Sequence, residues 1–457
     1  MVRRYRPLLP CASWVVVFGT YVVLGWRLLR IISQRAVNIL YRDQWDFDNA
    51  TLFEKHSWWE IFRWQHGPHR QGLGAVLAKL LEPSIRWNSR YEDLAIGGII
   101  ILSAILALCL KYRLLGGISI SDVIIPGFFL TPAQFENLFA ATNPSHGCLP
   151  LLLAMLYCLS WTLTSCWWRY LCVLATNFLL IYTGFGIFAG FLTPLLIAVD
   201  WYRNAPRRDK KYQACCAVAL LASSASLASF FVGYRLEPAA GCFSLYPASP
   251  IRYADFISLM FANVVKGSEL PPLALGGLLL ASVVICLVNV SAKLFRAEAG
   301  AWTRHAIVGF LLAYTLLFCL NTAYGRQCLG MDFATSPRYV TYTVLGFFGL
   351  YLFALSIPGR RDILIFGLFA LALLCSGRMD DHDRMAANWV SNGKRAWREC
   401  YLKRHDVQGC NVLAGFEIYP GDDKGQLQRK LDFLERNHLN LFADSNPDPG
   451  RRLTEGR

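Results

Sequence analysis

The chain has 457 residues, of which 55% are hydrophobic, 14% aromatic and only 17% charged, and its mean hydropathy is +0.35. A soluble chain carries charges on about a quarter of its residues, so this composition excludes a disordered protein and disfavours a soluble enzyme. The net charge of +14 comes from cations that stand beside apolar runs instead of forming one stripe, which disfavours nucleic acid as a partner. The lipid bilayer is therefore the predicted surrounding of most of the chain.

Long apolar runs predict an all-α polytopic membrane protein with about eleven transmembrane helices. A helix needs roughly 20 apolar residues to cross the hydrocarbon core, where no water satisfies backbone groups. The pair of spans on either side of Gly184 and Gly186 is also compatible with one broken hairpin. The predicted spans are 9–29, 94–111, 119–135, 146–164, 169–184, 186–201, 213–232, 271–290, 305–322, 339–356 and 362–377.

The Lys and Arg residues of short loops predict the orientation, because cytoplasmic loops carry an excess of them. If the N-terminus is cytoplasmic, most loop cations fall on its side, and an odd number of spans leaves loop 30–93 and tail 378–457 outside the cytoplasm. The domains expected are a transmembrane domain over 1–377 and a small extracytoplasmic domain over 378–457. The predicted cytoplasmic cations are Arg3, Arg4, Arg6, Lys111, Arg113, Arg169, Arg203, Arg207, Arg208, Lys210, Lys211, Lys293, Arg296, Arg304, Arg360 and Arg361.

Four cysteines outside the spans are candidates for disulfides in an oxidising compartment. Cys400 and Cys410 share the tail, and Cys242 and Cys328 lie on two outer loops. No Cys or His spacing predicts a metal site, although a divalent metal cofactor stays open as an alternative.

The first outer loop begins with two carboxylates, Asp43 and Asp46, beside Trp45 and Phe47. A helical turn would place both carboxylates on one face, where they could bind a sugar and remove a proton from its hydroxyl. The alternative is a solvated helix start with acidic residues in its first turn.

Farther along the loop, tryptophans at 58, 59 and 64 predict an interfacial helix that lies on the bilayer. His66 and His69 straddle Gly-Pro and are followed by Arg70. Such a cluster can present donors to a phosphate, and an ordinary turn is the alternative.

Two further outer segments carry polar candidates. Gln134, Glu136 and Asn137 follow the third span and can either bond substrate hydroxyls or cap a helix. Arg326 and Arg338, the latter followed by Tyr339, can hold a lipid phosphate or snorkel toward headgroups.

The tail turns charged and polar after Cys375, and apolar spacing over 424–441 predicts a helix within it. Three roles are open for this tail: a cover for the active site, a surface that recognises the acceptor, or a structural cap.

The predicted layout resembles the GT-C superfamily of membrane glycosyltransferases: a cytoplasmic N-terminus, a first span, a long outer loop with acidic residues near its start and an interfacial helix, and about eleven spans. Four short segments also look like a largely uncharacterised bacterial group of this type. They are Asp43-Gln44-Trp45-Asp46-Phe47, Trp64-Gln65-His66-x-x-His69-Arg70, Pro132-Ala133-Gln134-x-Glu136-Asn137 and Ser336-x-Arg338-Tyr339.

The resemblance implies an inverting transfer of a sugar from a polyprenyl-phosphate donor to a glycan, lipid or protein acceptor, at the outer face of a bacterial inner membrane. It implies that Asp43 or Asp46 is the catalytic base, with Asp43 the first choice. The Asp-x-x-Asp spacing departs from the adjacent or Asp-x-Asp pair of some members. Two rival hypotheses are a transporter or flippase of polyprenyl-linked saccharides and a non-catalytic subunit of an envelope-assembly complex.

Overall fold

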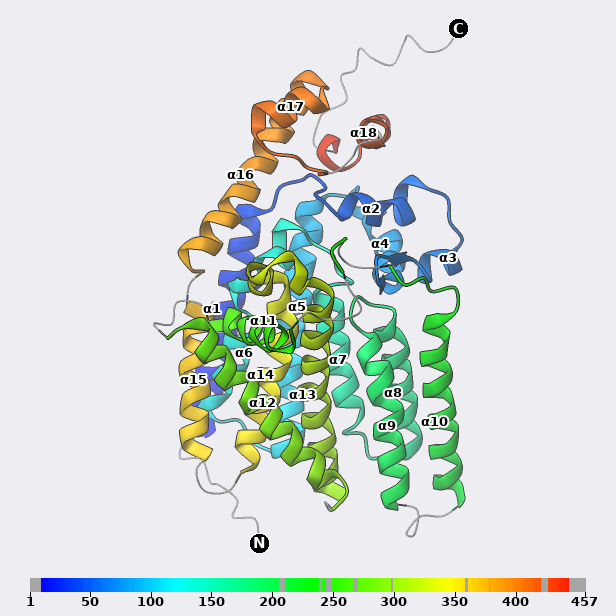
Figure 1. Cartoon of the computed structure of the whole chain (residues 1–457), viewed down its shortest axis with the longest axis vertical. Coiled ribbons are helices and arrows are strands. Elements are labelled where there is room, and N and C mark those ends of the chain that lie inside the picture. Colours follow the sequence, from blue (N-terminus) through cyan, green and yellow to red (C-terminus); the bar gives the residue numbers. More distant parts are fainter. Residues whose placement is uncertain are drawn as a thin grey trace.

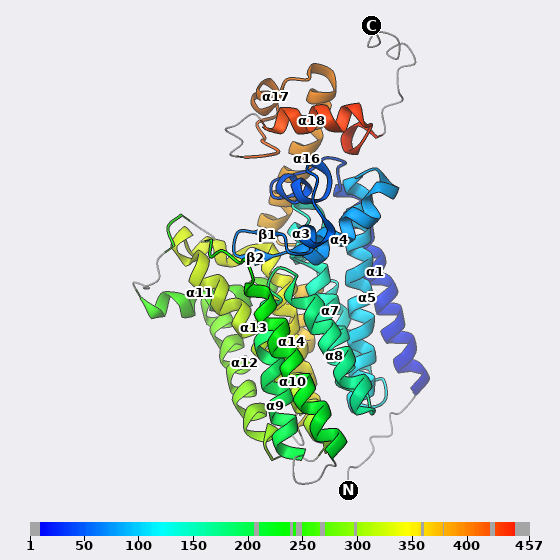
Figure 2. The same cartoon turned by 90° about the vertical axis from the view of Figure 1, so that its right-hand side faces the viewer.

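The computed structural model describes residues 10–204, 210–237, 241–243, 249–265, 270–296, 299–357, 361–377, 379–420 and 426–443. Long helices run side by side in one bundle, and residues 36–88 and 379–443 gather at one end of it, which we call the loop face (Figures 1 and 2). The expected cytoplasmic cations Arg3, Arg4, Arg6, Arg207, Arg208 and Arg360 lie outside the described residues.

Among the described residues, seven helical stretches are long and apolar enough to cross a membrane, which confirms an all-α, multi-pass membrane protein. Four of them match one long helix each, two add a short 3₁₀ segment to a long helix, and the seventh includes α15 and part of the tail. They are α1 (Pro10–Arg35), α5 (Ser89–Leu115), α10 (Lys210–Phe231), α12 (Pro272–Leu294), α13 (Ala299–Arg326), α14 (Val340–Ser356) and α15 (Arg361–Gly377).

Three shorter helices complete the parallel set. They are α7 (Cys148–Ser160), α8 (Cys166–Ile181) and α9 (Ile187–Asn204). The turn between α8 and α9 carries Gly184 and Gly186, so the two spans predicted there are two separate helices. A Cβ on Gly186 would lie 1.5 Å from the carbonyl oxygen of Leu180, which is why this turn requires glycine.

The helices differ in how much of their apolar surface the protein itself covers. In α14, 83% of the apolar window is buried, whereas the corresponding share is 28% in α1 and in α12. The exposed apolar faces of these peripheral helices are those that a bilayer would cover.

The continuous helix predicted over 119–135 is wrong, because the chain breaks there into short pieces. They are η3 (Ile120–Val123), α6 (Ile124–Phe129), η4 (Pro132–Gln134) and the π-helical η5 (Glu136–Ala140). Thr131 adopts an extended conformation before Pro132 and caps η4 with its side chain. A proline disfavours the helical conformation in the residue before it, and this ends α6.

The connection between α1 and α5 folds into short elements at the loop face. The tryptophans Trp58 and Trp59 lie exposed on α3, as expected for an interfacial helix, but α4 has no counterpart in the prediction. These elements are α2 (Gln44–Asp48), η1 (Asn49–Phe53), α3 (Trp58–Phe62), the hairpin of β1 (Gln65–His66) and β2 (His69–Arg70), α4 (Gly72–Leu81) and η2 (Glu82–Ile85).

Two other loop regions also contain helices. The segment before α12 holds α11 (Pro250–Ala262) and η7 (Asn263–Val265), which the sequence did not predict. The connection from α13 to α14 holds η8 (Gln327–Leu329), η9 (Met331–Thr335) and η10 (Pro337–Tyr339).

The tail forms α16 (Asp381–Arg404), α17 (Val407–Ala414), α18 (Gln426–Arg436) and η11 (Asn440–Phe442). Helix α18 lies within the predicted range 424–441 and buries Leu427, Leu431 and Leu434. The structure joins Cys400 to Cys410 and Cys242 to Cys328, so both predicted disulfides are present.

Candidate functional site

Asp43 belongs to a group of charged side chains that come from three separate parts of the chain. It is the residue before α2, its side chain is exposed, and it is close enough to Arg338 for the two charges to interact. Arg338 Nη2 donates to Oε1 of Glu136, and Ser336 Oγ donates to Oε2 of the same carboxylate at 2.8 Å. The site thus joins the first loop, the segment after α6 and the start of α14.

The break before Pro132 determines how the second of these parts presents its side chains. Asn137 Nδ2 donates to the carbonyl of Arg338 at 3.0 Å and to Thr341 Oγ1 at 2.9 Å. Thr341 Oγ1 in turn donates to Oε1 of Gln134 at 2.9 Å. Gln134 and Asn137 are therefore buried and bonded to protein groups, so they hold η4 and η5 against η10 and α14.

Glu136 is ionised in this arrangement. Burial by itself would raise the pKa of Glu136, but the charge and hydrogen bond of Arg338 and the hydroxyl of Ser336 lower the pKa below its ordinary value. The Glu136–Arg338 pair is partly buried. Removing one partner of a buried ion pair strongly destabilises the fold, because the other charge is left uncompensated.

Arg326 and Tyr339 adjoin this pair. Arg326 Nη1 donates to the hydroxyl of Tyr339 at 3.1 Å, and the guanidinium lies 5.8 Å from the centre of its ring. Tyr339 is buried, whereas Arg326 is partly exposed at the end of α13. The hydrogen bond therefore holds the arginine in place near Arg338.

Asp46 lies in a different environment from Asp43. Its Oδ1 accepts a hydrogen bond of 2.5 Å from the hydroxyl of Tyr419, which belongs to the tail. The structure thus separates the two predicted carboxylates: the charge of Asp43 acts on Arg338, and Asp46 connects the first loop to the tail.

The predicted His-x-x-His-Arg cluster forms a two-stranded hairpin, in which His66 pairs with His69 and Gln65 with Arg70. Arg70 is buried, and its guanidinium donates to the backbone carbonyls of Arg63, Phe230 and Val232. These contacts fix the hairpin against the end of α10. The side chain of Arg70 therefore serves the structure of the loop in this conformation, rather than a phosphate.

His69 is buried against His146 and Phe185, with ring centres 5.0 Å and 4.3 Å apart. Burial and the charge of Arg326 lower the pKa of His69 to about 3, so the ring is neutral at pH 7. His66 is partly exposed and stacks on Trp64 at 5.6 Å.

Sequence reasoning missed His146, which precedes α7. Its ring nitrogen bonds Gln71 at 2.7 Å, and Gln71 also accepts from Asn143 at 2.7 Å. Burial and the charges of Arg338 and Arg326 lower the pKa of His146 well below its ordinary value. No local spacing links His146 to the hairpin, because contacts between the start of α4 and residues 143–146 bring the two together.

A second group of acidic side chains, also missed, lies beneath α2. Burial raises the pKa of Asp48 to about 7, and burial together with the charges of Glu92 and Asp48 raises the pKa of Glu82 well above its ordinary value. Lys430 of the tail acts on Asp48 and donates to the carbonyl of Trp45 at 2.9 Å. These contacts connect the tail to the loop that carries Asp43.

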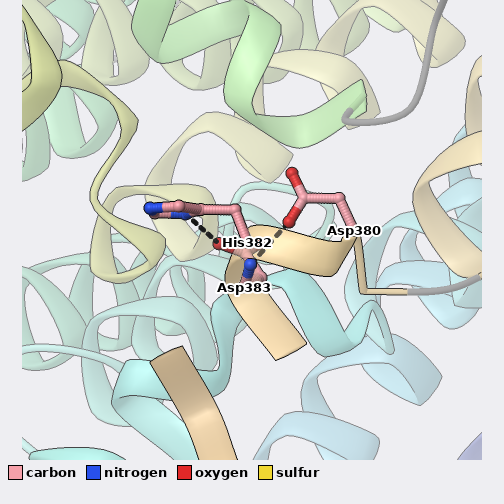
Figure 3. Close-up of side chains that lie close together, drawn as sticks. All are labelled: Asp380, His382 and Asp383. Atoms are coloured by element: carbon pink, nitrogen blue, oxygen red, sulfur yellow. Dashed lines mark hydrogen bonds and ion pairs between the residues drawn. The ribbon is translucent and has the colours of Figure 1, made fainter. Parts of the chain in front are cut away.

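One group in the described residues has the composition of a metal site. Asp380, His382 and Asp383 place possible ligand atoms within 4.8 Å of one another at the start of α16 (Figure 3). Asp380 Oδ1 accepts from the backbone N–H of Asp383 at 2.6 Å, and His382 is 84% exposed. The arrangement is that of an N-cap.

The helices and their apolar surfaces define the class of this protein, an all-α membrane protein with several spans. No family model matches the chain, and no curated protein matches it.

Proposed function

We propose that this protein is a membrane glycosyltransferase of the GT-C type, which moves a sugar from a polyprenyl-phosphate donor to a glycan, lipid or protein acceptor. The observation that carries the proposal is the exposed carboxylate of Asp43 beside the Glu136–Arg338 ion pair, with Arg326 close by. A general base next to fixed cations is the arrangement required for displacement of a phosphate.

In the proposed reaction, Asp43 takes the proton of the acceptor hydroxyl as that oxygen attacks the anomeric carbon of the donor. The bond from the anomeric carbon to the phosphate oxygen breaks, and the electron pair leaves with the lipid phosphate. Arg338 and Arg326 stabilise the charge that accumulates on the phosphate. A single direct displacement inverts the anomeric centre.

The division of roles between the two carboxylates rests on their partners. Tyr419 donates a hydrogen bond to one oxygen of Asp46. The side chain of Asp43, by contrast, makes no capping hydrogen bond to the backbone of α2. We therefore assign the base to Asp43 and a positioning role to Asp46. His66 and the neutral His69 and His146 would line the donor side of the site.

The membrane topology that we propose has eleven crossings. This number comes from the seven apolar stretches, the three shorter helices α7, α8 and α9, and the broken segment 120–134. Because the number of crossings is odd, the N-terminus and the loop face lie on opposite sides of the membrane. Lys111, Arg113 and Arg169 lie at the end of the bundle away from the loop face, which supports a cytoplasmic N-terminus. We propose a bacterial inner membrane as the location, with the loop face outside the cytoplasm.

The test is sugar transfer by the full chain in proteoliposomes, supplied with radiolabelled polyprenyl-phosphate hexoses and pentoses and an envelope extract. Asp43→Asn is expected to lower transfer by roughly 10²–10⁴-fold, the usual contribution of a general base, and Asp46→Asn by less. Asp332→Asn is the matched control, because Asp332 is an exposed carboxylate on η9. Undiminished transfer by Asp43→Asn would remove it as the base.

A further inference from the structure

A second cationic site lies at the loop-face end of α1, away from Asp43. It is a pocket of about 280 Å³ between the end of α1, the start of α5 and the middle of α16. Among the described residues, its lining includes three arginines and no Asp or Glu. The polar lining residues are Ser33, Gln34, Asn38, Arg90, Arg395 and Arg398.

Two of the three arginines of this pocket are held in place by backbone carbonyls. Arg395 Nη2 donates to the carbonyl of Gln34, and Arg398 Nη2 donates to the carbonyl of Leu441 at 3.3 Å. The charge of Arg395 also acts on Arg35. Three arginines with no acidic residue in the described lining favour the binding of an anion, and guanidinium groups match the geometry of a phosphate.

The surface that leads to the pocket is apolar and exposed. Val15, Phe18, Val22 and Trp26 follow one another at helical spacing on α1 and are 53–71% exposed. With a rise of 1.5 Å per residue, this stripe is about 16 Å long, close to the thickness of one leaflet of hydrocarbon, roughly 15 Å. Trp26 ends the stripe, and tryptophan is enriched where the hydrocarbon meets the headgroups.

Arg30 continues the stripe one turn beyond Trp26 and is exposed. Ser33 and Gln34 follow one turn later and belong to the pocket. A lipid whose acyl chain lies along this stripe therefore has its headgroup phosphate at the arginines of the pocket.

We propose that this pocket binds the phosphate of an anionic lipid, whose acyl chain lies along the exposed face of α1. The pocket shares no residue with the Asp43–Arg338 site, so this lipid is a separate ligand from the donor proposed above. A free phosphate carries the same anionic group, but the apolar stripe would add nothing to its binding. Basic pockets between membrane helices bind anionic headgroups on the cytoplasmic side, and the same pairing of charges would act here at the loop face.

Native mass spectrometry of the full chain in detergent, titrated with phosphatidylglycerol, phosphatidylcholine, polyprenyl phosphate or inorganic phosphate, tests the proposal. The wild type is expected to bind phosphatidylglycerol more tightly than phosphatidylcholine. Arg90→Gln combined with Arg395→Gln should weaken phosphatidylglycerol binding by roughly tenfold or more. Arg252→Gln with Arg436→Gln removes the same charge at positions outside the pocket and should leave binding within about twofold.

Arg90→Gln alone is the second variant, because Arg90 is exposed at the first turn of α5 and its loss does not disturb the backbone contacts of Arg395. A measurable loss of phosphatidylglycerol binding in this folded variant supports the site even if the double variant does not fold. Tighter binding of polyprenyl phosphate than of phosphatidylglycerol, lost in the same variants, supports the site with the carrier as the lipid. Equal losses in the control pair, no preference over phosphatidylcholine, or binding of inorganic phosphate as tight as that of the lipid would overturn the proposal.

Discussion

Asp43 and Asp46 are three residues apart and were predicted to act together, yet their partners differ. Asp43 is exposed beside Arg338, whereas Asp46 accepts a hydrogen bond from Tyr419 in the tail. Spacing along one helix predicts which side chains share a face, but it does not predict what a distant segment brings to that face. The roles of neighbouring carboxylates are thus determined by residues that are 295 or more positions away.

The Glu136–Arg338 pair predicts a loss of both stability and activity when it is broken. Glu136→Gln leaves Arg338 without its counter-charge, and breaking a buried pair in this way costs about 3–5 kcal/mol. Thermal unfolding in detergent measures the first effect and sugar transfer the second. Arg338→Lys keeps the charge but not the planar guanidinium, so it should recover stability in part and transfer little.

The lowered pKa of Glu136 also gives the sign of a pH effect. A carboxylate whose pKa is lower in the folded state stabilises the protein above the pKa of the unfolded state, and the contribution is lost as the pH falls through the folded value. The stability difference between the wild type and Glu136→Gln should therefore shrink on acidification below about pH 4.5. A difference that grows at low pH would contradict the ionised state of Glu136.

His69 predicts a pH effect over a different range. Its pKa is about 3 in the folded protein, while an unfolded histidine has a pKa of about 6.5. Between these values only the unfolded state binds the proton, so stability falls as the pH decreases from about 6.5 to 3. His69→Gln should lose less stability over this range than the wild type, measured by unfolding at several pH values.

At the scale of elements, apolar runs predicted ten helices to within a few residues, because length and hydropathy decide which segments can cross a bilayer. The same criterion failed over 119–135. Prolines are tolerated in membrane helices when neighbouring groups satisfy the freed backbone groups. Pro132 alone therefore did not predict that the helix would break. Helix α11, which contacts α12 and α13, was missed since its 13 residues are too few for a span.

The turn between α8 and α9 provides an element-scale prediction. Gly186→Ala places a Cβ against the carbonyl of Leu180, and such overpacking costs about 1–3 kcal/mol or more. The change should also disturb Phe185, on which His69 packs. Thermal unfolding checks it against Gly98→Ala in α5, where a Cβ meets no atom within 4 Å and stability should not fall.

At the scale of the whole molecule, the tail packs on the first loop. Arg42 N–H donates to the carbonyl of Ile418 at 2.8 Å, and Tyr41 stacks on Phe416 at 5.2 Å. Helix α18 was predictable from its apolar spacing, whereas α16 and α17 were not predicted. The docking of the tail was not predictable either, since the contacts pair residues more than 350 positions apart. Of the three roles left open for the tail, these contacts favour the structural cap, which would position the loop of Asp43.

The hydrogen bonds of Asn440 are expected to stabilise the docking of the tail on the first loop. Its side chain donates to the carbonyl of Trp87 at 2.6 Å and to Ser89 Oγ at 3.0 Å, and its carbonyl accepts from Asn38. Its φ of 47° is also one that asparagine tolerates better than alanine. Asn440→Ala should cost about 1–3 kcal/mol and speed cleavage of the tail in limited proteolysis.

Asn437→Ala is the control for this experiment, because Asn437 is exposed and its side chain donates, among the described contacts, only to the carbonyl of Phe433 in α18. Equal protection of the tail in both variants would contradict the docking contacts of Asn440.

The most direct test of a transferase is made in detergent, where a transporter has no second compartment to fill. Purified protein is mixed with a radiolabelled polyprenyl-phosphate sugar and an envelope extract, and both the labelled acceptor and the released polyprenyl phosphate are measured. The account predicts equal amounts of the two products, with neither formed by Asp43→Asn. Donor recovered unchanged across the panel, by protein that is folded and lipid-bound, would contradict it and favour a transporter or a non-catalytic subunit.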